Sequence, residues 1–271
     1  MTTELFLGRK IDYPRRYSPE LLCPIPRADS RAALGLAGDL PFHGCDIWNA
    51  WELGWLDGHS QPQVAVAEIR VPAESPNIIE SKSFKLYLNS LAMTRFETPT
   101  RLVETLITDT SHAAGADVRV ALSGVADSQA ASTRSLEGEC LDLRSVRCDT
   151  WDIDSDLLAA DPDSVVSEVL HSHLLRSLCP VTNQPDCGSV QISYRGPRID
   201  HDSLLRYVVS FREHNDFHES CIERMFLDIL DRCSPDRLTV YARYLRRGGI
   251  DINPFRSNFE SEPENVRLWR Q

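Results

Sequence analysis

One order of elements occurs twice along the chain, and this duplication limits what the chain can fold into. In the first half, QVAVAEIR at 63–70 alternates like a strand, SKSFKLYLNSLA and TPTRLVETLITDTSHAAG have helical periodicity, and DVRVALSG alternates again. In the second half, SVQISYRG, DHDSLLRYVVSFRE, ESCIERMFLDILDRCS and LTVYARYL repeat that order. We therefore expect two similar halves, each with the order strand, helix, helix, strand.

Further strand candidates flank each set. They are WELGWLD and ECLDLRS in the first half and DINPFRS in the second. The pattern in each half therefore predicts an antiparallel sheet covered on one face by a pair of helices, which is an α+β fold. The acidic stretch DTWDIDSDLLAADPD at 149–163 is the candidate connection between an N-terminal domain at 1–150 and a C-terminal domain at 151–271. The alternative is a surface loop within one domain.

Composition excludes several classes of protein. The 271 residues are 42% hydrophobic, which supplies a core for one large domain or two smaller ones. A net charge of −11 makes the surface as a whole repel nucleic-acid phosphates, so an anionic ligand needs a local basic pocket. The N-terminal MTTELFLGRK lacks the apolar run of a signal peptide, and no stretch reaches the length of a membrane span. A cytoplasmic protein with no direct nucleic-acid or membrane partner is expected.

The eight cysteines show no CxxC spacing, which favours free thiols in a reducing compartment over a disulfide framework. Cys179, Cys187, Cys221 and His218 are the candidate zinc ligands, but their spacing matches no common finger or ribbon. No bound metal is expected. A Rossmann half is not supported either, because no GxGxxG follows a strand.

Three polar stretches carry candidate binding groups, and each also has an ordinary structural explanation. ESKSFKLYLNS at 80–90 is either a helix start that holds an anion or a simple capped helix with exposed lysines. RRGGIDINPFRS at 246–257 sets two arginines beside a double glycine that lets a phosphate approach closely, or is a solvated turn. In HNDFHES at 214–220, Glu219 is either a first-turn acid or an acceptor for the paired N–H groups of a guanine-like base.

Together with CPVTNQPD at 179–186, these stretches resemble, in the same order, the motifs of the NADPH-dependent 7-cyano-7-deazaguanine reductases. These are nitrile reductases of queuosine biosynthesis, a tRNA modification pathway. The resemblance extends over most of the chain and is to the longer, two-domain form, which implies tandem tunnelling-fold (T-fold) halves. The first forty or so residues and the 123–160 region contribute little to it.

The resemblance implies a covalent mechanism for CPVTNQPD. Cys179 matches the cysteine that adds to the nitrile carbon, and the resulting thioimide accepts hydride more readily than the nitrile does. Asp186 matches the proton donor that meets the nitrile nitrogen as sulfur attacks. Pro180 and Pro185 restrict the backbone between the two. Cys187 ranks below Cys179 as the nucleophile because the family motif begins at the Cys-Pro pair.

The resemblance also implies binding residues in both halves, at whose interface we expect the site. The substrate is expected to meet Ile79, Glu80, Ser81, His218 and Glu219, and NADPH is expected to meet Ser81, Lys82, Arg247 and Gly248. Two hydrides are needed, and the imine formed between them hydrolyses in water, so a closed site is expected. The family resemblance suggests a homodimer at least.

Two other classes stay open. A nitrilase-like hydrolase would use Cys179 with Glu80 and either Lys82 or Lys85, would need no NADPH and would yield a carboxylic acid. A purine- or pterin-binding T-fold protein, or a cyclohydrolase relative, would share the scaffold without the reduction, because fold alone does not determine chemistry.

Overall fold

The computed structural model describes residues 13–124, 126 and 133–271, and the chain forms two compact units. The first takes its described residues from Met1–Gly38, Cys45–Ser132 and Arg246–Ile252. The second takes them from Asp39–Gly44, Thr133–Leu245 and Asn253–Gln271. The prediction made for MTTELFLGRK concerns residues outside the described ones. None of the described helices is long and apolar enough to cross a membrane.

The first unit contains an antiparallel sheet with the strand order β5-β3-β2. Its strands are β2 (His43–Leu56), β3 (Pro62–Pro72) and β5 (Arg119–Gly124). A separate antiparallel pair joins β1 (Pro24–Pro26) to β4 (Asn77–Ile79), and the short helix α1 (Arg27–Ala33) follows β1. Strand β4 leads directly into the helix that carries the ESKSFK motif.

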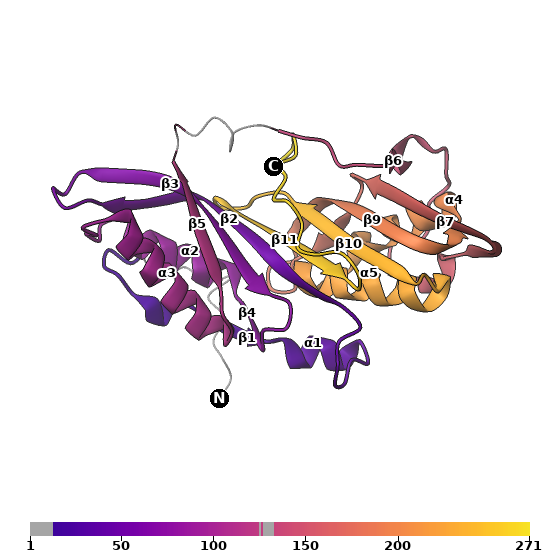
Figure 1. The fold of residues 1–271 in the computed structure, drawn as a ribbon, viewed down its shortest axis with the longest axis horizontal. Helices are drawn as coiled ribbons and strands as arrows, with labels where there is room; N and C mark the ends of the chain where they lie inside the picture. Colours follow the sequence, from indigo (N-terminus) through magenta and orange to yellow (C-terminus); the bar gives the residue numbers. More distant parts are fainter. Residues whose placement is uncertain (1–12, 125, 127–132) are drawn as a thin grey trace. The chain divides into compact units, whose positions relative to one another are not determined.

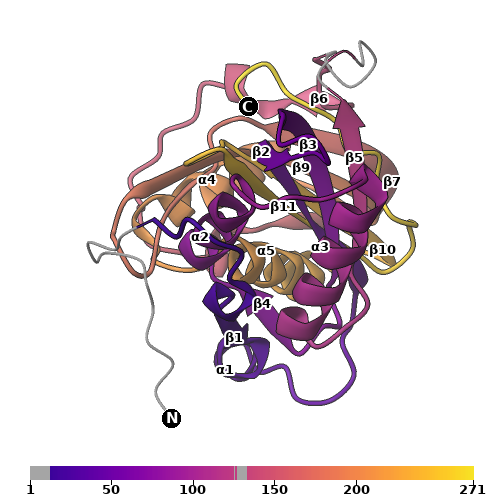
Figure 2. The same cartoon turned by 90° about the vertical axis from the view of Figure 1, so that its left-hand side faces the viewer.

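Two helices, α2 (Ser81–Leu91) and α3 (Pro99–Ala114), cover one face of this sheet (Figures 1 and 2). Their apolar residues recur at helical spacing, so each helix turns one stripe toward the strands. The resulting core includes Phe84, Leu88, Leu91, Leu102 and Leu106 from the helices and Leu53, Ala67, Ile69 and Val71 from the strands. This packing fixes the direction in which the start of α2 points.

The second unit also consists of a sheet with two helices on one face. The strand order runs from the part of β11 (Ile250–Ser257) that begins at Asn253 through β10 (Arg237–Tyr244), β9 (Pro185–Ile199) and β7 (Ala160–Ser172) to β6 (Glu139–Cys140). Strand β8 (Arg176–Leu178) pairs with the start of β9. The pairs that β9 makes are antiparallel, whereas β6 runs parallel to β7. Helices α4 (His201–Ser210) and α5 (His218–Cys233) lie on one face of this sheet (Figure 1).

Alternation along β9 separates the two faces of that sheet. His218 of α5 stacks on Tyr244, and Tyr244 pairs with Gly188 of β9. Because successive strand residues face opposite sides, the even-numbered residues of β9 near this point face the helices. Buried Val190 and Ile192 accordingly join the helix-side core, and odd-numbered residues such as Gln191 face the other way.

The predicted order of elements is confirmed in both units, as β3-α2-α3-β5 and β9-α4-α5-β10, and so is the α+β class. The division into domains at 1–150 and 151–271 stays a prediction. The predicted strand at ECLDLRS is largely wrong, because only Glu139–Cys140 is strand and the 3-10 turn Leu141–Leu143 follows. The turn is stabilised by Asp142, whose carboxylate accepts hydrogen bonds from Ser172 Oγ and the His173 N–H. These bonds hold the backbone at Asp142 in the turn, so it does not continue as a strand.

Candidate active site

The stretch CPVTNQPD forms the turn of a hairpin between β8 and β9. Ser177 lies opposite Asp186 in the register, so Cys179 sits just past the end of β8. The Cys179 N–H donates to Gln184 O at 2.9 Å, and the Asn183 N–H donates to Cys179 O at 2.9 Å. Asn183 has φ 58°, a left-handed conformation that asparagine tolerates better than most residues. The turn buries Cys179 and Asp186, which are only 3% and 5% exposed.

The start of α5 is tied to the same hairpin through the backbone. The Leu178 N–H donates to His214 O at 2.7 Å, and the Asp216 N–H donates to Leu178 O at 3.1 Å. The Asn215 side-chain amide donates to Asn183 Oδ1 at 2.6 Å and to Cys179 O at 3.4 Å. These bonds fix HNDFHES against the turn and set the first residues of α5 beside it.

His218, the first residue of α5, contacts the predicted acid. Its Nε2 lies 3.3 Å from Asp186 Oδ2, and its ring stacks on Tyr244 at 3.7 Å between centroids with an interplanar angle of 1°. The Nδ1 atom of His218 is buried with no hydrogen-bond partner among the described residues. Glu219 follows in the first helical turn and is 3% exposed. Cys179, Asp186, His218 and Glu219 therefore belong to one hairpin and the helix start bonded to it.

The other cysteines near this site differ from Cys179. Cys187 follows Asp186 in β9, so alternation places its side chain on the opposite face. Burial, followed by the charge of Asp216, raises the pKa of the Cys221 thiol well above its usual range. In the part of the chain that the structure describes, the cysteines and histidine considered as zinc ligands do not bring their ligand atoms together.

In the first unit, the ESKSFK motif forms the start of α2. The Glu80 carboxylate is the N-cap, accepting from the Lys82 N–H at 2.9 Å and the Ser83 N–H at 2.7 Å. Ile79 and Glu80 are buried, whereas Ser81 and Lys82 are half-buried. The capping explanation for this motif is therefore confirmed for Glu80, and the role of Ser81 and Lys82 stays a prediction.

The RRGG stretch forms a tight turn in the same unit. Arg247 and Ile250 exchange backbone hydrogen bonds at 2.9 and 3.2 Å across two glycines with φ 59° and 80°. Positive φ at both central residues defines a type I′ turn, which explains the double glycine. A Cβ added at Gly248 would lie 2.7 Å from Lys85 Nζ, so the turn lies directly against α2. The structure therefore brings Arg247 and Gly248 to the helix that carries Ser81 and Lys82.

The predicted substrate residues divide between the two units. Ile79, Glu80 and Ser81 lie in the first, and His218 and Glu219 lie in the second. Their convergence on one substrate stays a prediction. Sequence reasoning missed the stacking of Tyr244 on His218, the bridging by Asn215 and the position of Lys85 at the turn.

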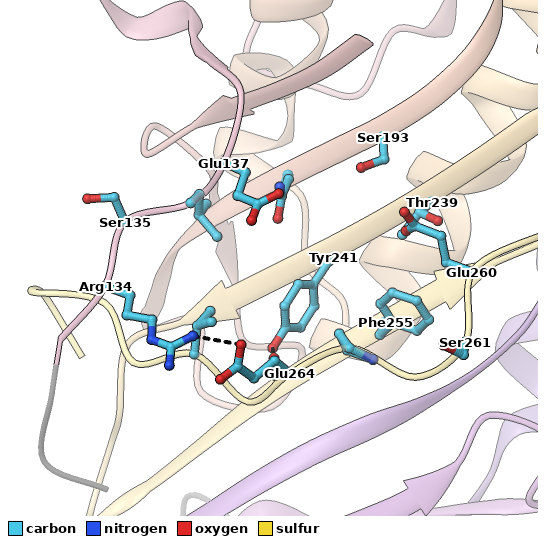
Figure 3. Close-up of a pocket in the computed structure, with 14 residues that line it drawn as sticks. Arg134, Ser135, Glu137, Ser193, Thr239, Tyr241, Phe255, Glu260, Ser261 and Glu264 are labelled. Carbon is cyan, nitrogen blue, oxygen red and sulfur yellow. Dashed lines mark hydrogen bonds and ion pairs between the residues drawn. The ribbon is translucent and has the colours of Figure 1, made fainter. Parts of the chain in front are cut away.

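A pocket of about 460 Å³ occupies the helix-free face of the second unit (Figure 3). Its lining includes Gln191 and Ser193 from β9, Thr239 and Tyr241 from β10, and the ion pair between Arg134 and Glu264. None of the predicted site residues lines it. This pocket is therefore separate from the predicted active site.

Two family models match the chain. One, described as nitrile reductase, 7-cyano-7-deazaguanine-reductase N-term, matches residues 13–122, and one described as QueF-like protein matches residues 185–263. The NADPH-dependent 7-cyano-7-deazaguanine reductase of Burkholderia vietnamiensis is 54% identical over 267 residues, which cover 98% of this chain and 97% of the relative. This chain belongs to that reductase family. The enzyme of the same name from Burkholderia multivorans is 53% identical with the same coverage.

Among solved structures, the apo crystal structure of the archaeosine synthase QueF-Like aligns with 36% of this chain and 97% of its own. The sequence identity is 19% and the TM-score is 0.31.

Replacing the α2 cap is expected to destabilise the first unit. In Glu80→Ala, two N–H groups at the start of α2 lose their acceptor, which should lower the free energy of unfolding by about 1 to 2 kcal/mol. Urea unfolding measures the change. Glu74→Ala, at an exposed acid in the preceding turn, is the matched control and should change stability by less than about 0.5 kcal/mol. Equal effects of the two substitutions would contradict a capping role.

Proposed function

We propose that this chain reduces the nitrile of 7-cyano-7-deazaguanine to 7-aminomethyl-7-deazaguanine with two molecules of NADPH, in queuosine biosynthesis. The observation that carries the proposal is the contact between Asp186 and His218 at the hairpin that holds Cys179. It supports the assignment of the proposed nucleophile, the proposed acid and the proposed base-recognition segment to one hydrogen-bonded assembly. Family membership supports the same reaction.

The wider proposal concerns organisation. Each unit is one T-fold half, the domains divide near residue 150, and the enzyme acts in the cytoplasm as a homodimer. The net charge of −11 supports a protein that modifies a free base and does not bind nucleic acid or an anionic membrane directly.

In the first chemical step, the sulfur of Cys179 adds to the nitrile carbon. Negative charge develops on the nitrogen, Asp186 delivers a proton there, and the proton that the Cys179 thiol loses returns to Asp186, so the thiol and nitrile become a neutral thioimide. His218, at 3.3 Å, holds the Asp186 carboxyl in position. The burial of Cys179 and Asp186 keeps bulk water from competing for the carbon.

NADPH supplies the hydrides when it is bound. Its phosphates need cations and a close backbone approach, and the RRGG turn offers both, since Gly248 has no side chain and Lys85 lies against it. We assign the cofactor to Ser81, Lys82, Arg247 and Gly248. These residues fit an anionic ligand in an otherwise acidic protein.

In the second chemical step, one hydride has been added to the thioimide carbon and one proton to its nitrogen, so the carbon carries both sulfur and an amino group. The carbon–sulfur bond breaks, Cys179 recovers its proton, and the substrate becomes an imine. A second hydride and a proton then give the primary amine. Overall, two hydrides and two protons are consumed per nitrile, and the thiol returns to its starting state.

In this proposal, residues at the start of α5 bind the base of the substrate. Glu219 accepts two hydrogen bonds from the ring N–H and the exocyclic amine of the base, the paired donors that a carboxylate suits. His218 has a buried Nδ1 without a partner among the described residues, which supports a second polar contact to the substrate. Ile79, Glu80 and Ser81 complete the contacts from the first unit.

Turnover assays separate this function from the alternatives. The purified chain mixed with 7-cyano-7-deazaguanine should oxidise two NADPH per nitrile and yield the amine, identified by mass spectrometry. A carboxylic acid formed without NADPH would show a hydrolase instead. Tight binding with no turnover in either assay would show a binding module.

Removing the proposed phosphate contact should affect the cofactor selectively. Arg247→Ala should raise the KM for NADPH by about tenfold to a hundredfold, because a charge-assisted contact contributes about 1.5 to 3 kcal/mol. The KM for the nitrile should change much less. Arg147→Ala, at a side chain that is 91% exposed, is the control and should change neither. Equal losses for nitrile and cofactor would assign Arg247 a structural role.

A further inference from the structure

Three metal-ligating side chains converge on the helix-free face of the second unit, away from the proposed active site. Cys140, His171 and His173 each offer one ligand atom, and these atoms lie within 4.8 Å of one another. The parallel pairing of β6 with β7 sets Cys140 directly opposite His171. The two imidazole rings lie edge to face, with centroids 5.2 Å apart.

Hydrogen bonds already orient both histidines. His171 Nδ1 lies 2.9 Å from Glu137 O, and because a carbonyl only accepts, this nitrogen must carry the proton. The neutral ring then presents the Nε2 lone pair. His173 Nδ1 lies 2.8 Å from Ser189 Oγ, which orients the ring, and when the hydroxyl accepts this bond the Nε2 lone pair of His173 is presented as well. A histidine that bonds an oxygen through one nitrogen and offers the other is the usual arrangement of a metal ligand.

The local fold brings Cys140 into place with little freedom. Gly138 has φ 85°, and a Cβ there would lie 1.9 Å from Val169 O, so the segment before Cys140 runs against the backbone of β7. Asp142 holds the segment after it by accepting hydrogen bonds from Ser172 and His173. Strand β6 has only two residues, so its attachment depends on such side-chain contacts.

We propose that Cys140, His171 and His173 bind one Zn²⁺ ion per chain, with water at the fourth position. One sulfur and two nitrogen ligands suit zinc, whose tetrahedral geometry sets neighbouring ligand atoms roughly 3.3 to 3.6 Å apart. The three ligand atoms therefore need to approach one another by about 1.2 to 1.5 Å at most. Binding releases the thiol proton and joins β6 to β7. The proposal replaces the sequence-based expectation of no metal.

Cobalt titration tests the site, because Co²⁺ occupies zinc sites and absorbs visibly. The chain carrying Cys179→Ala, stripped of metal with a chelator, should bind one Co²⁺ with a thiolate-to-cobalt absorption band, and one equivalent of Zn²⁺ should remove the band. The Cys179 substitution removes the thiol that would compete. Adding Cys140→Ser should abolish the band and weaken binding about a hundredfold or more, and His173→Asn should weaken it similarly.

Cys148→Ser is the matched control, since Cys148 is a half-buried cysteine eight residues further along the chain, and it should leave the band unchanged. Alkylation of the wild-type chain gives a test that needs no variant. Zn²⁺ should protect Cys140 from a thiol reagent, as read by peptide mapping. A missing band, a band that survives Cys140→Ser, or equal alkylation of Cys140 with and without Zn²⁺ would overturn the proposal.

Discussion

Cys179→Ala should eliminate the covalent adduct. When the wild-type chain is mixed with 7-cyano-7-deazaguanine and no NADPH, intact-mass spectrometry should show the mass of one substrate added per chain, and the variant should show none. Turnover should fall by about a thousandfold or more, the scale seen when a nucleophile is removed from an enzyme. The fold should survive, because the turn is held by backbone bonds of Cys179 that alanine also makes.

Cys187→Ala is the control for that experiment. Strand alternation turns Cys187 away from Asp186, so its loss should leave both the adduct and turnover close to wild type. Peptide mapping of the wild-type adduct should show that Cys179 carries the added mass. Finding it on Cys187 would reverse the assignment.

Glu219→Gln should abolish nitrile binding while NADPH affinity stays near wild type. Glutamine presents an NH₂ where the base needs an acceptor, which sets donor against donor in a buried position. The mismatch and the lost charge assistance should cost about 3 to 5 kcal/mol, or roughly a hundredfold to several thousandfold in affinity. Calorimetric titration of the nitrile measures the loss, with a melting curve of the same sample.

The competing explanation, a first-turn acid that only stabilises α5, predicts the opposite pattern. Nitrile affinity would be unchanged, and stability would fall by about 1 kcal/mol or less. Glu213→Gln serves as a control, because Glu213 is an acid 56% exposed that pairs with Arg176 at 3.0 Å. It should have almost no effect on nitrile binding. A Glu219→Gln protein with normal nitrile affinity would place the base anchor elsewhere.

Periodicity predicted the helices well because each helix buries one stripe against a sheet. The stripe of Phe84, Leu88 and Leu91 is visible in the sequence before any tertiary contact is known. Strand β7 was not predicted, because the local sequence at its start does not favour a strand. It begins ADPDS, residues with low strand propensity, and its pairing with β9 outweighs that preference. No local pattern reveals a partner so far along the chain.

The candidate site was predictable where motif residues are close in sequence. Cys179 and Asp186 lie in one hairpin. The prolines and the asparagine between them are typical of a turn, so the sequence predicts that turn. The contact of Asp186 with His218 depends on the docking of α5, and the sequence gives no sign of it except through family resemblance. Tyr244 lies on a predicted strand, but only the register of β10 with β9 shows that it faces His218.

The alternation along β9 also determines where the chain tolerates changes of length. Asp186 faces the helices and the proposed reaction, and Ser189, three residues later, faces the other side and orients His173. Deleting one residue between them would shift the following strand by one position and exchange its two sets of side chains. Such a deletion should therefore disable both sites at once. Insertions in the irregular segment at 145–150 should be accommodated, because this segment contains none of the residues assigned to either site.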